Sequence, residues 1–217
     1  MAKMLGEGSF GRCYLTDDFR VLKIFTMAKF INKIDERLIG IKNDTYVFYD
    51  SFLKNEYEKL GIYERYIPNK SLDKKDISYS LLINAIDKVY SDTDDLSYQG
   101  IETCDVLPRN MIYYNGIKII DTDFYNASSS DKLLKASNIQ RFNQGVEALI
   151  IPNDEIPKIL LDNKNLNELW LQTMESLDDN RTLKEFLICL RDECMKNKNE
   201  KIDTAWGMYR TLSRWLL

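Results

Sequence analysis

The first third of the chain alternates short apolar runs with glycines and polar turns, a pattern typical of β-strands. We expect strands at Lys3–Leu5, Cys13–Leu15, Arg20–Phe25, Thr45–Leu53 and Leu60–Tyr66. Between the third and fourth of these strands, apolar residues recur with helical spacing at Phe30, Ile31, Ile34, Leu38 and Ile41. This spacing predicts one helix with a stop near Gly40.

The rest of the chain has mostly helical spacing, interrupted by one hairpin signal. We expect an amphipathic helix over Ser78–Tyr90, and then two strands, Met111–Tyr114 and Ile117–Ile120, joined at Asn115-Gly116. After a polar run at 128–130, two apolar stripes follow, Leu183, Phe186, Leu187 and Leu190, and then Trp206, Tyr209, Leu212 and Trp215. Strands followed by helices predict an α+β fold with a boundary near residues 67–73.

Composition and charge then exclude several classes of function. The 217 residues are 44% apolar and 29% charged with a net charge of −4, which is typical of a soluble globular protein and not of a nucleic-acid-binding one. There is no histidine, which excludes Ser-His-Asp and Cys-His catalysis and His-ligated metals. No apolar run approaches the roughly 18 residues that a membrane-spanning helix needs.

The cysteines indicate a compartment. Cys13, Cys104, Cys189 and Cys194 form no C-x-x-C pair, and we expect no secretory leader before them. We therefore expect reduced thiols and a cytoplasmic location, including a host cytosol if the chain is a bacterial effector or a viral protein.

A G-x-G-x-x-G element lies between the first two expected strands, at Gly6-Glu7-Gly8-Ser9-Phe10-Gly11. Glycines let the backbone approach a phosphate closely. The residues after it, Arg12-Cys13-Tyr14-Leu15, favour a strand rather than the helix that follows this motif in dinucleotide-binding folds. A glycine loop between two strands favours a flap over phosphates, and a hairpin without a ligand has the same pattern.

Four further polar residues stand at the ends of apolar segments. Lys23 ends the apolar run Val21-Leu22, where a buried ammonium needs an anionic partner. Asp105 and Asn110 flank a short loop, and Asp121 follows the second strand of the expected hairpin. Mg²⁺ takes hard oxygen ligands, few of them from protein when nucleotide phosphates complete its shell. Each of these residues taken alone also fits a solvent-exposed loop or an edge strand.

Together and in this order, these segments resemble the protein-kinase family over about residues 4–126. Lys23 matches the lysine that holds the α- and β-phosphates. Glu36 is the best match to the glutamate that pairs with this lysine, and Asp35 is the neighbouring alternative. The segment Glu64–Leu72 resembles the hinge whose backbone binds adenine. Thr103-Cys104-Asp105 stands where His-Arg-Asp would be, so the resemblance makes Asp105 the catalytic aspartate.

The resemblance implies a bilobal kinase-like fold, an antiparallel-sheet N-lobe (1–67, with a single helix) and a reduced helical C-lobe (68–217). It implies ATP and Mg²⁺ as cofactors, Asp105 and Lys23 as catalytic residues, and Asn110 and Asp121 as metal ligands. The implied nucleotide-binding residues are Gly6, Gly8, Ser9, Phe10, Gly11, Cys13, Val21, Lys23, Glu36, Glu64 and Tyr66.

The departures from the family bear on activity. Cys104 replaces the arginine that reads a phosphorylated activation loop, Leu107 replaces a lysine of Ser/Thr protein kinases, and Asp121-Thr122-Asp123 lacks the glycine of Asp-Phe-Gly. No Ala-Pro-Glu follows, so the activation segment is reduced. We expect a kinase that moves the γ-phosphate of Mg-ATP to a hydroxyl acceptor, with protein Ser/Thr as one candidate.

Three alternatives stay open at this point. The first is a nucleotide-binding pseudokinase or scaffold, and the second is a small-molecule kinase of the aminoglycoside-kinase type, which shares an Asp-x-Asp-like metal site. The third is a helical interaction module that uses aromatics such as Trp206 and Trp215. The sequence does not specify the acceptor, the oligomeric state or the pathway.

Overall fold

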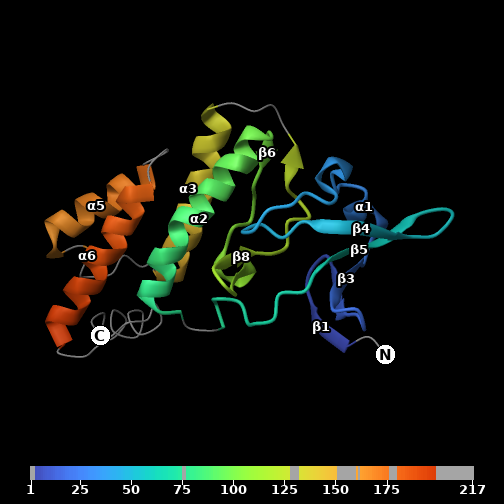
Figure 1. Ribbon diagram of the computed structural model, residues 1–217, viewed down its shortest axis with the longest axis horizontal. Helices are drawn as coiled ribbons and strands as arrows, with labels where there is room; N and C mark the ends of the chain where they lie inside the picture. Colours follow the sequence, from blue (N-terminus) through green and yellow to red (C-terminus); the bar gives the residue numbers. More distant parts are fainter. Residues whose placement is uncertain are drawn as a thin grey trace.

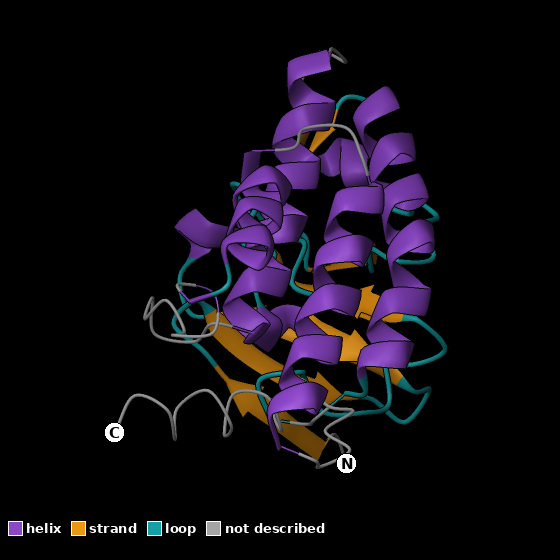
Figure 2. Ribbon diagram, turned by 90° about the vertical axis from the view of Figure 1, so that its left-hand side faces the viewer, coloured by secondary structure: helices purple, strands orange, loops and turns teal. Residues whose placement is uncertain are grey.

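A computed structural model of the chain describes residues 3–74, 77–127, 132–150, 160, 162–175 and 180–198. It confirms an α+β fold (Figure 1), with a five-stranded antiparallel sheet at one end of the molecule and long helices at the other. Figure 2 shows the helices standing in front of the sheet when the molecule is turned by a quarter. Short strands lie between the sheet and the helices (Figure 1).

The sheet has the strand order β1-β2-β3-β5-β4. Its strands are β1 (Lys3–Glu7), β2 (Gly11–Leu15), β3 (Arg20–Phe25), β4 (Tyr49–Lys54) and β5 (Lys59–Arg65). In the register of β3, Lys23 lies between Cys13 on β2 and Ile62 on β5, while Val21 faces Glu64. Alternate residues of a strand share a face. Lys23 and Glu64 therefore lie on the same, buried face of the sheet.

Gly11 shows how closely β2 and β3 approach each other. A Cβ at this position would lie 2.5 Å from the carbonyl oxygen of Ile24, which no side chain tolerates. The last glycine of the G-x-G-x-x-G element is therefore required by the sheet itself. The two earlier glycines, Gly6 and Gly8, have no atom within 4 Å of such a Cβ.

The single helix expected over 30–41 is wrong. The chain instead forms α1 (Ala28–Ile31) and the 3-10 turn η1 (Glu36–Leu38). Asp35 is extended and its carboxylate accepts the backbone N–H of Arg37, so it caps a new element instead of continuing the first. The helical spacing nevertheless marked burial correctly, since Ile34 is buried.

The strand expected from Thr45 begins only at Tyr49. The segment before it leaves the sheet and pairs with β8 (Ile117–Ile119), because Val47 N donates to Ile119 O at 2.8 Å and Ile119 N donates to Thr45 O at 2.7 Å. This crossing joins the sheet to the hairpin formed by β7 (Met111–Tyr113) and β8.

The helical part is built on α2 (Tyr79–Tyr98), which extends well past its expected end at Tyr90. The Ser78 hydroxyl caps it by accepting the Leu81 N–H. α2 packs against α3 (Lys132–Ile150) and α6 (Asn180–Lys198), and α5 (Lys164–Glu175) packs on α6. β6 (Ile101–Glu102) pairs with β9 (Asn126–Ala127), and η2 (Pro108–Asn110) precedes β7.

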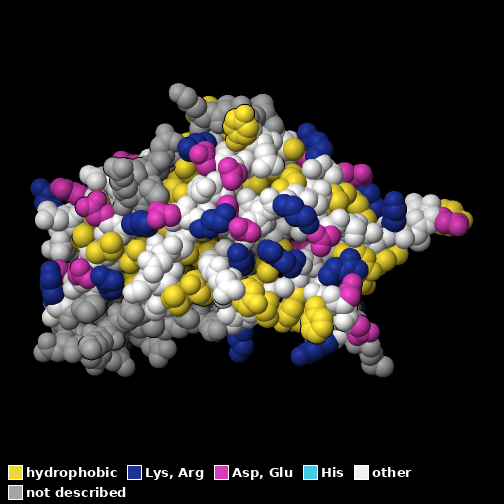
Figure 3. Space-filling model, viewed as in Figure 1, with side chains coloured by type: hydrophobic (Ala, Val, Ile, Leu, Met, Phe, Trp, Pro, Cys, Tyr) yellow, Lys and Arg dark blue, Asp and Glu magenta, His cyan; other side chains and the backbone are white. Residues whose placement is uncertain are grey.

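The first predicted stripe of the C-terminal region is confirmed, since Leu183, Phe186, Leu187 and Leu190 are buried in the core. The second stripe, with Trp206 and Trp215, and the polar run at 128–130 lie outside the described residues. Within the described ranges, no helix has the length and apolar character required to cross a membrane. On the face shown in Figure 3, basic and acidic side chains are interspersed rather than segregated.

Candidate functional site

The β7–β8 hairpin delivers two of the expected site residues. Asn115 and Gly116 have φ of 50° and 110°, the left-handed turn that the sequence predicted. At the other end of the hairpin Ile120 N donates to Asn110 O at 2.9 Å. Asn110 and Asp121 therefore emerge from the open end of the hairpin next to each other.

Lys23 meets this end of the hairpin from the sheet. Its Nζ donates to Asp121 Oδ1 at 2.5 Å and also contacts Asp123 Oδ2. The side chain of Lys23 is 10% exposed, whereas those of Asp121 and Asp123 are 35% and 0% exposed. A strand near the N-terminus and a loop near the middle of the chain thus form one ionic cluster, in which only Asp121 is open to solvent.

Asp105 and Asn110 form a second pair next to this cluster. Asn110 Nδ2 donates to the Asp105 carbonyl at 2.9 Å and to its Oδ2 at 3.0 Å. Asp105 Oδ1 accepts from Arg109 at 2.6 Å, and its side chain remains 40% exposed. Within the described part of the chain Asn110 Oδ1 has no hydrogen bond. This oxygen can bind a cation while the amide nitrogen stays on Asp105.

Two of the three aspartates at the site have an unusual backbone. Asp105 has φ of 52° and Asp121 has φ of 62°, in the left-handed region that non-glycine residues seldom adopt. Asp and Asn tolerate this region better than most residues, but it still costs free energy. Such strain concentrates at functional sites, where it directs a side chain toward a ligand.

The charges of the cluster explain its protonation. Burial alone would lower the pKa of Lys23. The negative charges of Asp123 and Asp121 raise this pKa by more than burial lowers it, so the ammonium stays charged. Burial raises the pKa of Asp123, which the nearby Lys23 opposes. Burial also raises the pKa of Glu64, to about 8. The negative charges of Asp123 and Asp121, which lie near its carboxyl, raise this pKa as well. At neutral pH Glu64 is therefore mostly protonated.

Glu64 gives the first testable prediction. The pKa of Glu64 is about 8 in the folded chain and about 4.5 in the unfolded chain. The protonated carboxyl therefore contributes its full share to the free energy of unfolding below pH 4.5, and this share is lost as the pH rises through about 8. Glu64→Gln should match the wild type near pH 4.5 and be more stable by several kcal/mol at about pH 9, since one pKa unit corresponds to about 1.4 kcal/mol. Urea unfolding at both pH values measures this. Glu58→Gln, at an exposed position, is the control, and equal pH profiles for wild type and E64Q would contradict the prediction.

The expected partner of Lys23, Glu36, is wrong, and so is Asp35, its neighbouring alternative. Glu36 does not pair with Lys23, because its carboxylate binds Lys59, the first residue of β5, whereas Lys23 lies opposite Ile62. Asp35 does not pair with Lys23 either, since it accepts from Arg37 and from the backbone N–H of Ala127. The broken helix is the physical reason, because η1 directs both acids away from β3.

The glycine loop folds toward the same site. The ring of Phe10 at its tip packs edge-on against Phe124, at 5.1 Å between centroids, and against Phe30 of α1, at 4.7 Å. Phe124 directly follows Asp123, so the loop tip lies against the segment that carries the cluster. Gly8 N donates to Gly11 O at 2.9 Å across the turn, and Ser9 is exposed between them.

The remaining expected nucleotide contacts line the sheet. Val21 and Cys13 flank Lys23 on β3 and β2, and Tyr66 follows β5 at a half-buried position. Burial raises the pKa of Cys13 to about 11, and it does the same for Cys104 beside Asp105. Neither thiol is therefore a thiolate at neutral pH, which argues against cysteine chemistry at this site.

Sequence reasoning did not assign Asp123. The Asp-x-Asp spacing is visible in the sequence. It does not show that both acids point to Lys23, because alternate residues share a face only where the segment is a regular strand. Asp123 Oδ1 and the Tyr125 hydroxyl are buried without a hydrogen-bond partner in the described structure. Buried polar groups without a partner are rare in folded proteins, so each of these two atoms calls for a water molecule, an ion or a functional role at this place.

A divalent cation fits part of this donor set. The Asp121 side chain is 35% exposed, and Asn110 Oδ1 has no hydrogen bond among the described residues. Mg²⁺ commonly uses one or two protein oxygens, with phosphates and water as the remaining ligands. Within the described residues no group of three or more His, Cys, Asp or Glu side chains is arranged to hold a metal alone.

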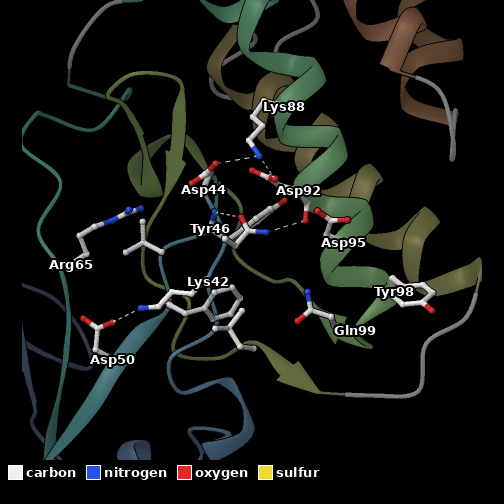
Figure 4. A pocket seen from close by; sticks show the side chains of 14 residues that line it. Lys42, Asp44, Tyr46, Asp50, Arg65, Lys88, Asp92, Asp95, Tyr98 and Gln99 are labelled. Atoms are coloured by element: carbon white, nitrogen blue, oxygen red, sulfur yellow. Dashed lines mark hydrogen bonds and ion pairs between the residues drawn. The ribbon is translucent and has the colours of Figure 1, made fainter.

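A separate pocket of about 430 Å³ lies between the 41–50 segment and α2 (Figure 4). Its charges are largely compensated, because Lys88 lies 2.7 Å from Asp92 and 3.3 Å from Asp44. Arg65 points toward it without an ion pair among the described residues. Carboxylates outnumber cations along its wall, so no class of ligand follows from it.

No protein-family model matches the chain, and a search of curated proteins also found no match to it. Any functional conclusion therefore depends on the geometry of the residues described above.

Proposed function

We propose that this chain is an ATP-dependent phosphotransferase with a bilobal, protein-kinase-like fold, and that it moves the γ-phosphate of Mg-ATP to a hydroxyl acceptor. One observation carries the proposal. The ammonium of Lys23 on β3 lies against Asp121 at the end of the β7–β8 hairpin, next to Asn110 and Asp105. An ammonium, carboxylates and a carboxamide from separate segments are the groups that protein kinases use for phosphoryl transfer.

The sheet side of the site would bind the phosphates. The open backbone of Gly6 and Gly8 can approach phosphate oxygens, and Phe10 holds the loop tip down against Phe124. Lys23 then faces the same space from β3 and would neutralise the phosphate charge. In the present structure its ammonium is held by acids, so a phosphate must compete with Asp121 for it.

The hairpin side would hold the cation and the acceptor. Asn110 and Asp121 would bind Mg²⁺, which neutralises the charge on the phosphate oxygens when bound. Asp105 is exposed and is oriented by Asn110 and Arg109, so it would align the acceptor hydroxyl and receive its proton. Positioning and electrostatics, rather than covalent chemistry by the protein, carry the rate in this class of reaction.

The ion pairs that Lys23 already makes also favour a second candidate, a nucleotide-binding pseudokinase. Two carboxylates already satisfy the ammonium, so a chain of this kind could bind nucleotide without turning it over. The two functions differ in turnover and not in binding.

The test measures both properties on the full chain. Mg-ATP at about 100 times its Kd should raise the free energy of unfolding by about 2.7 kcal/mol, and the gain should shrink when EDTA removes Mg²⁺. Transfer of labelled γ-phosphate, to a hydroxyl acceptor or to water, identifies the phosphotransferase. Binding without transfer favours the pseudokinase, and absence of Mg-dependent binding at millimolar ATP contradicts both.

A further inference from the structure

We propose that Asp123, a residue of the segment that follows the β7–β8 hairpin, is the carboxylate that positions Lys23, so that no helix of the N-terminal part is needed for this task. The inference rests on the proposed function and deepens it. It assigns a positioning residue, and it also predicts that activity is independent of the Glu36 carboxylate.

The contacts divide the two acids on Lys23 into different roles. Asp121 is partly exposed and has a left-handed backbone, so its carboxylate can turn to a ligand. Asp123 is fully buried, so its carboxylate stays beside Lys23 and is closed to a ligand that approaches Asp121 from solvent. Once Asp121 binds a cation, Asp123 is the acid that remains on the ammonium.

The backbone around Asp123 is fixed on both sides. The wholly buried Thr122 donates its hydroxyl to the Val47 carbonyl at 2.9 Å, and Tyr125 N donates to Thr122 O at 3.1 Å. Val47 N is itself bound to Ile119 O at 2.8 Å. A carboxylate on such an anchored loop holds its partner in one place, which is the property that a positioning residue needs.

The geometry also excludes the acid that a helix would supply. Glu36 is 66% exposed and binds Lys59, at the start of β5. Lys23 instead faces Ile62, three residues further along β5, which is about 10 Å at the rise of a strand. Glu36 is therefore out of reach unless η1 moves.

The first test compares Asp123→Asn with Glu36→Gln, which makes the same chemical change at the acid on η1. We expect D123N to lower kcat about 10-fold to 100-fold with a smaller change in KM for ATP, because a mispositioned lysine still binds phosphate. We expect E36Q to keep the wild-type kcat. Loss of kcat in E36Q with wild-type kcat in D123N overturns the proposal.

A second readout does not depend on turnover. Urea unfolding of Lys23→Met, Asp123→Asn and the double variant gives a coupling cycle, and the same cycle is measured with Glu36→Gln. The midpoint shift of the Lys23–Asp123 double variant should be smaller than the sum of the single shifts, whereas the Lys23–Glu36 shifts should add. Additive shifts in both cycles overturn the proposal.

This cycle also separates the inference from the proposed function. If the wild type transfers no phosphate, the proposed function fails, and a coupled Lys23–Asp123 pair still supports Asp123 as the partner of the lysine. If Asp123→Asn does not fold, Thr122→Val replaces it, since this change keeps every charge and removes only the hydrogen bond to Val47. A lowered kcat in T122V supports the proposal, and a wild-type kcat overturns it.

Discussion

Asp105→Asn is expected to abolish most phosphate transfer while leaving nucleotide binding intact. Asp105 is placed to receive the proton of the acceptor, and loss of a general base typically costs about 10²–10⁴ in rate. Asparagine suits this position because it tolerates the φ of 52° and keeps an oxygen for Arg109, and although the contact of Oδ2 with Asn110 is lost, Asn110 Nδ2 still donates to the backbone carbonyl of residue 105. The fold should therefore be unchanged. The measurement is kcat for γ-phosphate transfer, with the Kd for Mg-ATP determined separately by calorimetry.

Asp50→Asn is the matched control for this variant. It makes the same chemical change at an exposed carboxylate on β4, whose nearest cation, Lys42, is 3.7 Å away. We expect it to retain wild-type kcat and Kd. If Asp105→Asn turned over as fast as Asp50→Asn, Asp105 would not be the base. If it lost Mg-ATP binding instead, its role would lie in the nucleotide site.

The parts of the fold that sequence predicted are those that depend on local chemistry or on strand periodicity. Asn115-Gly116 fixes a hairpin because both residues accept the left-handed backbone that the turn needs. The buried strand around Lys23 follows from apolar residues next to a charge that needs a partner. These signals placed Asn110 and Asp121 correctly on either side of the β7–β8 hairpin, and Lys23 inside the buried strand β3.

The parts that failed depend on contacts between distant segments. Glu36 was assigned by helical spacing, but spacing reports which residues are buried and not whether the helix is continuous, and Asp35 interrupts it by capping η1. Asp123 was not assigned because its burial depends on the packing of its loop against Val47. Neither outcome can be derived from the residues adjacent in sequence.

Lys23→Met is expected to give the largest loss of stability of any single change in this cluster. Methionine keeps the apolar stem of the side chain but leaves Asp123 as a buried acid without a cation. Removal of one partner of a buried ion pair typically costs about 3–5 kcal/mol. Lys59→Met is the control, because it breaks the exposed pair with Glu36 and should cost about 1 kcal/mol or less.

The pH dependence identifies the cause of this loss. Without the ammonium, Asp123 has a folded pKa well above its unfolded value, because burial then acts unopposed. A group with a raised folded pKa contributes stability below its unfolded pKa, and this stability is lost as the pH rises through the folded pKa. The deficit of K23M relative to wild type should therefore be small near about pH 4 and grow toward about pH 8. Urea unfolding across this range measures it, and a deficit independent of pH would show that lost packing, and not the uncompensated charge of Asp123, destabilises the variant.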